Sequence, residues 1–431
     1  MGRVVFAPWF ENEVLGDDNL FRRRSVHDVN VDPQDEFPGP GDFDSNSNGR
    51  FDPPVVSDVE TTVSAGVTAY IPFRMSSLQF AYEGDAYFYR DSSVENADTH
   101  TGSVQLALNS SNRDEFVFGG SYEQGITQRL TIEQENEFDI DVIEGIPLVR
   151  NDWSFSWSRT APRKPSWEAQ LDWVDLRYEP DPDDPDSTPS WVDYTGWSLR
   201  SEYLQPFYGK GYFTAVYSGR RHDQFETRAL SVTDELLRRE NYDALELGYR
   251  GLVGRNQPLY LALGYAKLNY KETTTITEPT NFSGAVGSLT WRIPVGGVTN
   301  MSVSANRRPT SSLSYNTYYL INELRVRFDR PLAEISRYGV SALLSNNRYG
   351  AILDEVLVGD RGVEACDVDG FEVIRKDRRN QIEGFWEWFI QPRMALRMTA
   401  GHSRRDVNCD SDVGSYVSNT VGVSFKLGWF D

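Results

Sequence analysis

The chain has 431 residues, and its 43 lysines and arginines against 64 aspartates and glutamates give a formal net charge of −21. That charge argues against nucleic-acid binding, which depends on a basic surface, and an aromatic content of 13% argues against a disordered acidic chain. No apolar run approaches the roughly 20 residues that a membrane-spanning helix needs, whereas the alternating strands of a membrane β-barrel average out as hydrophilic and fit this composition.

Period-two alternation is the dominant pattern along the chain. Trp153, Phe155 and Trp157 alternate with serines, and strand geometry gathers the three rings on one side, where helical spacing would scatter them. No segment has the spacing of a long amphipathic helix, and about eighteen segments are predicted to be strands. The alternation is clearest within 63–71, 78–82, 104–108, 153–158, 197–203, 245–249, 259–265, 289–293, 301–305, 324–328 and 394–398.

The connections between these segments alternate between short and long. Short turns on one rim and long loops on the other are typical of outer-membrane barrels. One connection on the long side, 309–312, is expected to be short. Short turns are predicted at 72–77, 111–114, 160–165, 208–211, 253–258, 294–297, 331–336 and 391–393, and longer connections at 15–58, 91–98, 124–148, 180–191, 222–239, 273–280, 351–376 and 406–414.

The predicted fold class is therefore all-β: a single transmembrane antiparallel β-barrel of about 18 strands over residues 1–431, with short periplasmic turns and long acidic extracellular loops. A soluble β-sandwich or β-propeller is the alternative. It is disfavoured because no blade-length repeat is visible and because Trp and Tyr gather on one strand face. The expected location is the outer membrane of a Gram-negative bacterium, in contact with lipid and lipopolysaccharide.

The two ends of the sequence carry separate signals. Residues 1–6 contain no apolar core of a signal peptide, so an exported protein is expected to be mature at this end. The last strand resembles the C-terminal signal by which the barrel assembly machinery recognises its substrates, and the match implies that machinery as a partner. Asp431 departs from the usual aromatic last residue, so Phe430 takes that role. The matching residues are Thr420, Gly422, Phe425, Leu427 and Phe430.

Charged residues of both signs stand opposite the apolar series on many strands. A closed apolar core could not hold them, because an unpaired buried charge is very unfavourable, but a water-filled lumen could, and about eighteen strands leave room for an aqueous channel. Two roles stay open for these charges: bracing the wall by mutual pairing, or contacting a solute. The predicted pore-lining residues are Arg200, Arg220, Arg250, Arg292, Arg308, Glu323, Arg325, Arg327, Glu383, Glu387 and Arg397; Glu83, Asp85, Glu202, Glu246 and Arg405 share their phase.

The two cysteines, Cys366 and Cys409, have acidic neighbours and no CxxC partner, which argues against a zinc site. They fall in consecutive long loops on one rim, where Cα atoms can approach the roughly 5.5–6 Å that a disulfide needs. We therefore expect one disulfide, as in an oxidising compartment. None of the four histidines has the surroundings of a catalytic residue, so the chain is not expected to be an enzyme. His402 follows the outward apolar phase and is expected at the rim.

Three stretches carry a family resemblance. They are Glu13–Phe21, which ends in DDNLF, Tyr87–Arg90 before a polar loop, and Asn306–Ser312 before a strand with Tyr315. With the overall pattern, they resemble the β-barrel porin family found beside exopolysaccharide and capsule operons, including the EpsL-like proteins. The resemblance implies an outer-membrane barrel associated with polysaccharide export and a periplasmic polysaccharide-export protein as partner. It supplies no catalytic residues.

The expected function is therefore a passive outer-membrane conduit for a surface polysaccharide. A general or solute-selective uptake porin is one alternative, and a structural or surface-adhesion barrel with a plugged lumen is another. Glycosyltransferase genes beside this one would favour export over uptake. Conductance in planar bilayers would separate both from a plugged barrel.

The long first loop contains a calcium-like motif, which departs from the resembled family. Oxygen-bearing side chains recur at alternate positions before a glycine, as several ligands of one hard cation require. The series D-x-N-x-N-G-x-x-D resembles the calcium loops of EF-hands, dockerins and thrombospondin type-3 repeats, although the twelfth position is Val55 and not Glu. The alternative is a solvated loop without metal. The expected Ca²⁺ ligands are Asp44, Asn46, Asn48, Asp52 and a backbone carbonyl near Arg50.

If this loop binds Ca²⁺, the double variant Asp44→Ala, Asp52→Ala and treatment with EDTA should each lower the melting temperature, because protein–Ca²⁺ contacts at about 2.3–2.6 Å are lost. Thermal denaturation of the purified chain with and without CaCl₂ measures this. Ser45→Ala with Ser47→Ala, at the intervening positions, is the control. A melting temperature that EDTA leaves unchanged contradicts the site.

Overall fold

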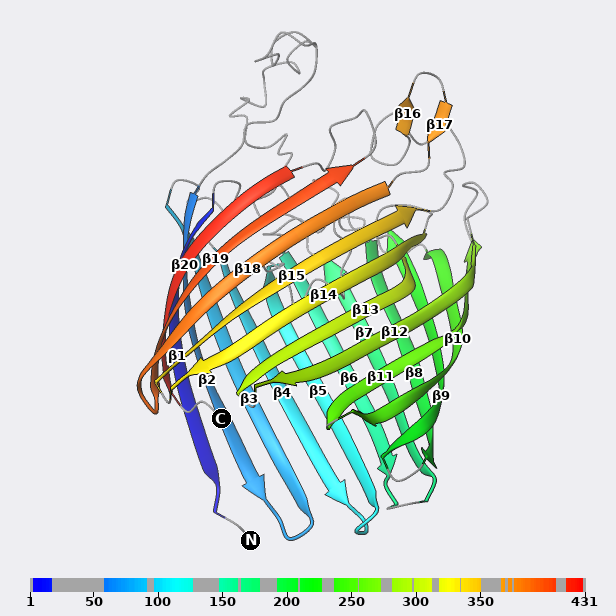
Figure 1. The fold of residues 1–431 in the computed structure, drawn as a ribbon, viewed down its shortest axis with the longest axis horizontal. Helices are drawn as coiled ribbons and strands as arrows, with labels where there is room; N and C mark the ends of the chain where they lie inside the picture. Colours follow the sequence, from blue (N-terminus) through cyan, green and yellow to red (C-terminus); the bar gives the residue numbers. More distant parts are fainter. Residues whose placement is uncertain are drawn as a thin grey trace.

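The computed structural model describes a single closed sheet of antiparallel strands with one small hairpin beside it (Figure 1). Within the described residues, no helix is long and apolar enough to cross a membrane. The described residues are 3–17, 58–90, 97–126, 147–161, 164–178, 192–207, 210–226, 236–254, 256–272, 281–296, 298–311, 318–333, 335–349, 366–368, 371–373, 376–407 and 416–428.

Eighteen strands form the barrel, and each pairs with two antiparallel neighbours. This confirms the predicted fold class and strand number. A further hairpin of β16 (Cys366–Val368) and β17 (Phe371–Val373) lies within the predicted long loop 351–376. The barrel strands are β1 (Val5–Asp17), β2 (Asp58–Pro72), β3 (Ser76–Tyr89), β4 (Ala97–Asn109), β5 (Asp114–Ile126), β6 (Pro147–Arg159), β7 (Ser166–Tyr178), β8 (Val192–Phe207), β9 (Gly211–Glu226), β10 (Leu236–Val253), β11 (Gln257–Glu272), β12 (Phe282–Val295), β13 (Thr299–Ser311), β14 (Tyr318–Leu332), β15 (Ser336–Tyr349), β18 (Lys376–Gln391), β19 (Met394–Val407) and β20 (Tyr416–Gly428).

The ring is closed by the pairing of β1 with β20, from opposite ends of the chain. Their register runs from Trp9 opposite Gly428 to Asp17 opposite Thr420. Side chains add to this seam, because Ser418 Oγ donates to the Asp17 carboxylate at 2.8 Å and Lys426 Nζ lies 2.6 Å from Glu11 Oε2. The two chain ends are thereby held together by both backbone and side-chain contacts.

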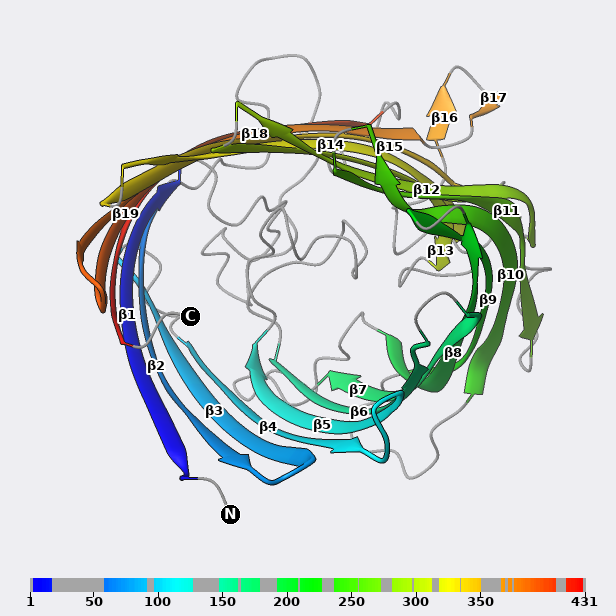
Figure 2. The ribbon, with the colours of Figure 1, turned by 60° about the horizontal axis from the view of Figure 1, so that its bottom comes forward.

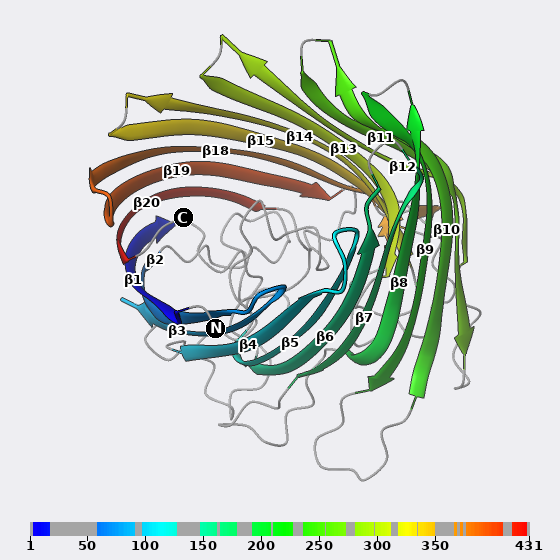
Figure 3. The same cartoon turned by 90° about the horizontal axis from the view of Figure 1, so that it is seen from below.

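All eight predicted short turns lie at one end of the barrel, here called the short-turn end, where the described chain also begins and ends (Figures 1 and 3). The turn between β10 and β11 shows why turn residues are needed there. Gly254 and Asn256 adopt left-handed backbone angles, with φ of 53° and 61°, which glycine and asparagine tolerate better than other residues. Turn chemistry therefore fixes where these strands reverse.

One predicted turn is misplaced. The sequence places a short connection at 309–312, but β13 continues to Ser311, and Pro309 lies opposite Leu320 of β14. The pairing of β12 with β13 ends at Gly287 and Arg307, so Pro309 lies where β13 is paired on one side only. Proline lacks an N–H donor and is tolerated at such an edge-like position.

The two faces of the sheet differ in chemistry. Arg250 Nη1 and Glu168 Oε2 lie 3.0 Å apart although β10 and β7 are three strands apart in the ring, which places these side chains on the concave, inward face. The alternate residues Leu245, Leu247 and Leu263 point outward and are 59%, 65% and 64% exposed. A buried apolar cluster, formed by Ala244, Ala266, Leu268, Tyr270, Phe282, Val286 and Leu320, packs between β10, β11, β12 and β14.

If the outward face meets lipid, Leu247→Arg should destabilise the folded barrel by about 2–4 kcal/mol, the cost of an arginine near the bilayer midplane. Thr290→Arg, on the exposed part of the inward face, is the matched control and should change stability far less. Denaturant titration of the refolding equilibrium in lipid vesicles measures both. Equal effects of the two variants would contradict this assignment of the faces.

Candidate functional site

The inward face of the barrel is the candidate functional site. Directly paired residues on neighbouring strands lie on the same face of the sheet, so the register identifies the inward-facing residues of each strand in turn. Arg327, for example, lies opposite Ser302 and Ser341. This register places every predicted pore-lining residue on the face of Arg250 and Glu168. They are Arg200, Arg220, Arg250, Arg292, Arg308, Glu323, Arg325, Arg327, Glu383, Glu387 and Arg397, joined by Glu83, Asp85, Glu202, Glu246 and Arg405.

Many of these arginines are held by carboxylates of the same wall. Several pairs join residues two apart on one strand, which share a face because strand side chains alternate. The contacts involving the predicted residues are Arg200 to Glu202 at 3.0 Å, Arg325 to Glu323 at 3.4 Å, Arg327 to Asp329 at 3.0 Å, Arg220 Nε to Glu240 at 2.7 Å, and Glu387 with Arg337. Wall bracing, one of the two roles left open for the charges, is therefore present in the structure.

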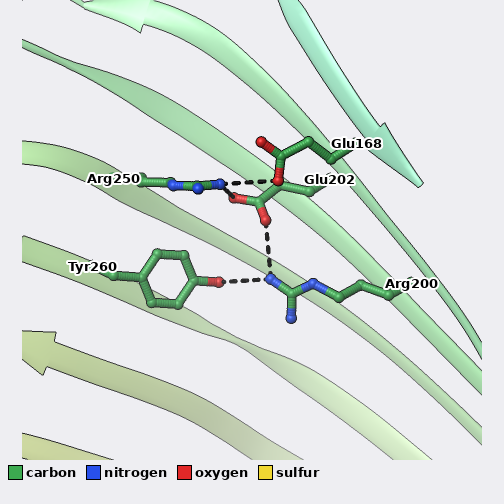
Figure 4. A network of polar contacts seen from close by, with 5 residues as sticks. All are labelled: Glu168, Arg200, Glu202, Arg250 and Tyr260. Carbon is green, nitrogen blue, oxygen red and sulfur yellow. Dashed lines mark hydrogen bonds and ion pairs between the residues drawn. The ribbon is translucent and has the colours of Figure 1, made fainter. Parts of the chain in front are cut away.

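The most extended network of these contacts joins β7, β8, β10 and β11 near the short-turn end (Figure 4). Glu202 is only 3% exposed and lies between Arg200, at 3.0 Å, and Arg250, at 3.8 Å. Arg250 also pairs with Glu168 at 3.0 Å, and Arg200 Nη2 donates to the Tyr260 hydroxyl at 3.4 Å. Two guanidinium groups are thus positioned by two carboxylates and a phenol.

A second set of charges is buried towards the opposite end of β18 and β19. Arg405 Nη2 donates to Asp377 Oδ2 at 2.5 Å, and both side chains are buried. Arg379 lies directly opposite Arg405 on the neighbouring strand and is also buried. Asp377 therefore offsets positive charge that water cannot reach.

Sequence reasoning missed an acidic wall. The strands β1 to β5 carry inward carboxylates and, over their described residues, no inward lysine or arginine. Only Glu83 and Asp85 among them were expected. The alternation of Glu11 and Glu13 with Phe10, Asn12 and Val14 is a usable signal in the sequence. The inward carboxylates of this wall are Glu11, Glu13, Asp17, Asp58, Glu60, Glu83, Asp85, Glu115 and Glu123.

The acidic wall lies across the lumen from strands that carry several of the predicted arginines. In the ring of 18 strands, β3 and β12 are nine strands apart, and Figure 2 shows β1 to β5 across the lumen from β13, β14 and β15. Arg292, Arg308, Arg325 and Arg327 all lie on β12 to β14. The lumen is therefore negative on one side and rich in arginine on the other.

Between these two walls lies a polar hollow of about 750 Å³. Its charged groups are largely held in place, with Arg150 Nε 2.7 Å from Asp152 and Gln170 Nε2 2.9 Å from Asp172. Arg308 of β13 reaches the same hollow. Besides valines and tryptophans, its neutral lining includes hydroxyls and amides that both donate and accept hydrogen bonds: Gln79, Ser103, Gln105, Ser121, Ser154, Gln170, Ser198 and Thr310.

Other predicted sites fall partly or wholly outside the described residues. The calcium-like loop, with Asp44, Asn46, Asn48, Arg50 and Asp52, lies outside them, as do Cys409 and Phe430, so the Ca²⁺ site and the disulfide stay predictions. Cys366 begins β16. Among the described residues, no group of three or more His, Cys, Asp and Glu side chains is arranged to hold a metal ion.

The remaining assembly-signal residues and His402 lie on the last two strands. Thr420, Gly422, Phe425 and Leu427 belong to β20, which pairs with β19 and β1, and Leu427 is exposed on the outward face. His402 has the outward phase, and its Nδ1 lies 2.8 Å from Asn419 Oδ1.

Comparison with known proteins finds similarity in structure only. No protein-family model and no curated protein matches the sequence. The FrpB iron transporter of Neisseria meningitidis is similar over 93% of this chain, with TM-scores of 0.53 for the F5-1 variant apoprotein at 9% identity and 0.51 for the F3-3 variant at 8%. The outer membrane protein OpdK of Pseudomonas aeruginosa covers 99% of both chains at 10% identity, with a TM-score of 0.46.

The FrpB similarity shows the fold. This chain spans 61% and 62% of the length of the two FrpB structures, so the similarity concerns the barrel architecture and not a whole transporter. The chain has the fold of an outer-membrane β-barrel.

Removal of Arg405 should be costly, because it leaves the buried Asp377 carboxylate without this partner. We expect Arg405→Gln to lower the free energy of unfolding by about 3–5 kcal/mol, as for other broken buried ion pairs. Arg404→Gln is the control: Arg404 pairs with Asp406 at 2.8 Å, but both are exposed, and such pairs contribute about 0–1 kcal/mol. Denaturant unfolding in detergent micelles measures the difference, and similar values for the two variants would rule out a stabilising role for the buried pair.

Proposed function

We propose that this chain is a passive outer-membrane conduit for hydrophilic solutes, and specifically for a saccharide polymer destined for the cell surface. The observation that carries the proposal is the contrast between the two faces of one closed sheet. The inward face holds carboxylates, serines and glutamines, joined by arginines on strands after β5, while the outward face holds leucines, valines and aromatic residues.

The charge content of the inward face supports a water-filled lumen. Arg292 is exposed on the inward face and forms no ion pair with a described residue, so its charge is stable there only if water solvates it, since an isolated charge is strongly disfavoured in an apolar interior. Barrels of 16–18 strands are wide enough for an aqueous channel. A wet lumen enclosed by an apolar girdle is the physical requirement for passive movement of polar solutes across a membrane.

The polar hollow supports a saccharide as the solute. Sugar hydroxyls both donate and accept hydrogen bonds, and so do the serine hydroxyls and glutamine amides of β3 to β8 that line the hollow. Carboxylates of acidic sugars could pair with Arg220 and Arg308 at its edge. Each such contact is weak and competes with water, and transport requires binding that is weak enough for release.

A passive lumen does not set the direction of movement. In the proposed export role, direction comes from supply of polymer in the periplasm, through a periplasmic polysaccharide-export protein that delivers it to the short-turn end. The same wall would also serve an uptake porin. Oligosaccharides of increasing length separate the two roles: a polymer conduit should show current interruptions that lengthen with the number of sugar units, whereas a porin for small solutes should exclude the longer chains.

The arginines of β14 should influence ion selectivity if the lumen conducts. We expect the double variant Arg325→Glu, Arg327→Glu to fold and to shift the channel towards cations, because it reverses two charges on the inward face. Reversal potentials in planar bilayers under a salt gradient measure this. The shift should shrink as salt rises, since the Debye length falls to about 8 Å near physiological ionic strength.

Lys267→Glu, an exposed outward-facing residue of β11, is the control and should leave selectivity unchanged. If neither the wild-type chain nor the variants conduct, the lumen is closed and the conduit proposal is wrong. If the double variant conducts with unchanged selectivity, these two arginines serve to brace the wall alone.

A further inference from the structure

A second cavity, of about 1010 Å³, opens at the short-turn end of the lumen. It is bordered by the turn between β8 and β9 and by inward residues of β10, β11 and β12. Its lining includes three cationic side chains, Lys210, Arg250 and Arg292, and no carboxylate among the described residues. The charge of this lining is therefore positive, opposite in sign to the net charge of the chain, −21.

The structure fixes one of these cations firmly. Arg250 is held from behind by Glu168 at 3.0 Å and by Glu202 at 3.8 Å (Figure 4). Glu202 is buried and shared with Arg200, so this carboxylate cannot swing into the cavity without leaving two arginines. Arg250 keeps 47% of its side chain exposed, and its guanidinium has more N–H donors than these two contacts use.

The other two cations have no such partner. Arg292 is exposed on the inward face of β12, and neither it nor the Lys210 ammonium forms an ion pair or side-chain hydrogen bond with another described residue. The backbone of Lys210 is nevertheless held, because its N–H donates to Phe207 O at 3.3 Å and its carbonyl accepts from Leu252 N at 2.8 Å. The cavity therefore presents two positive charges that no described carboxylate compensates, beside Arg250, whose two carboxylate partners lie behind it.

Apolar ring surfaces accompany these charges. Tyr212 and Tyr260 line the cavity on the inward face, as do Pro206 and Pro258. The Tyr260 hydroxyl accepts from Arg200 Nη2, which orients the phenol ring within the network of Figure 4. A ligand that suits this lining has an anionic group for the cations and a compact ring whose C–H face packs against tyrosine.

We propose that this cavity binds a single acidic sugar unit, a hexuronate, with its carboxylate at Arg292 and Lys210 and its ring against Tyr212 and Tyr260. This inference rests on the proposed function, because it assigns to a saccharide conduit the site at which the polymer enters from the short-turn end. The inference goes beyond the proposed function in stating that the transported polymer carries carboxylates. Arg250 completes the positive surface and orients the bound carboxylate through donors that Glu168 and Glu202 do not occupy.

Calorimetric titration of the full chain in detergent micelles with glucuronate tests the site. The wild-type chain should bind glucuronate and show no binding of glucose at the same concentrations. Arg292→Gln should weaken binding about tenfold or more, the effect of losing one charge-assisted contact, and Lys210→Gln should act in the same direction. Arg397→Gln is the matched control, because Arg397 faces inward but lies over the Phe385 ring at 4.5 Å, away from this cavity, and it should leave binding unchanged.

Three results would overturn the inference: no heat with glucuronate, equal binding by wild type and the Arg292→Gln, Lys210→Gln double variant, or inorganic phosphate binding as tightly as glucuronate, which would indicate a general anion site. Bilayer recordings on the same preparations keep the two proposals apart. Conductance without glucuronate binding leaves the conduit standing and removes the site. Glucuronate binding that depends on Arg292 without any conductance keeps the site and removes the conduit.

Discussion

The pairing of backbone N–H and C=O groups at every strand edge is the constraint on which this structure depends, because lipid provides no water to satisfy them. The seam between β1 and β20 meets it by joining the two ends of the chain. Without that seam, two long strand edges would be open to solvent, lipid and other chains. Closure also decides which side of the sheet is concave. The inward position of the predicted pore-lining arginines and carboxylates follows from it.

Once the inward face is fixed, strand geometry favours ion pairs between residues two apart, such as Glu323 with Arg325 and Arg327 with Asp329. These pairs hold each guanidinium beside a carboxylate of its own strand. Bracing and solute contact are then compatible, since an arginine that is paired on one side still has N–H donors for a solute. The arginines differ in how far their side chains are exposed, from the buried Arg405 to the exposed Arg292.

The strands, the short turns and the inward phase of the arginines were predictable because alternation and turn chemistry are local properties of the sequence. The contact of Arg250 with Glu168 was not, since 82 residues separate them and only ring closure brings their strands together. The turn at 309–312 was misplaced for a similar reason: the tolerance for Pro309 depends on where the neighbouring strand β12 stops pairing. On β1, Glu11 and Glu13 were overlooked because Asn12 interrupts the apolar series that marks the outward face.

The net charge of the chain describes this lumen poorly, because negative and positive side chains lie on different sides of the barrel. Carboxylates gather inward on β1 to β5, whereas Arg292, Arg308, Arg325 and Arg327 gather on β12 to β14. In physiological salt each wall acts over about one Debye length, roughly 8 Å, so a solute responds to the wall that it touches and not to an average over the lumen. An acidic polymer would then be excluded from the β1 to β5 side and confined to the arginine-bearing side. The part of the polar hollow that lies outside the acidic wall contributes Ser154, Gln170 and Ser198 of β6 to β8, in the same lining as Arg220 and Arg308, which places neutral hydrogen-bonding groups beside strands that such a polymer could follow.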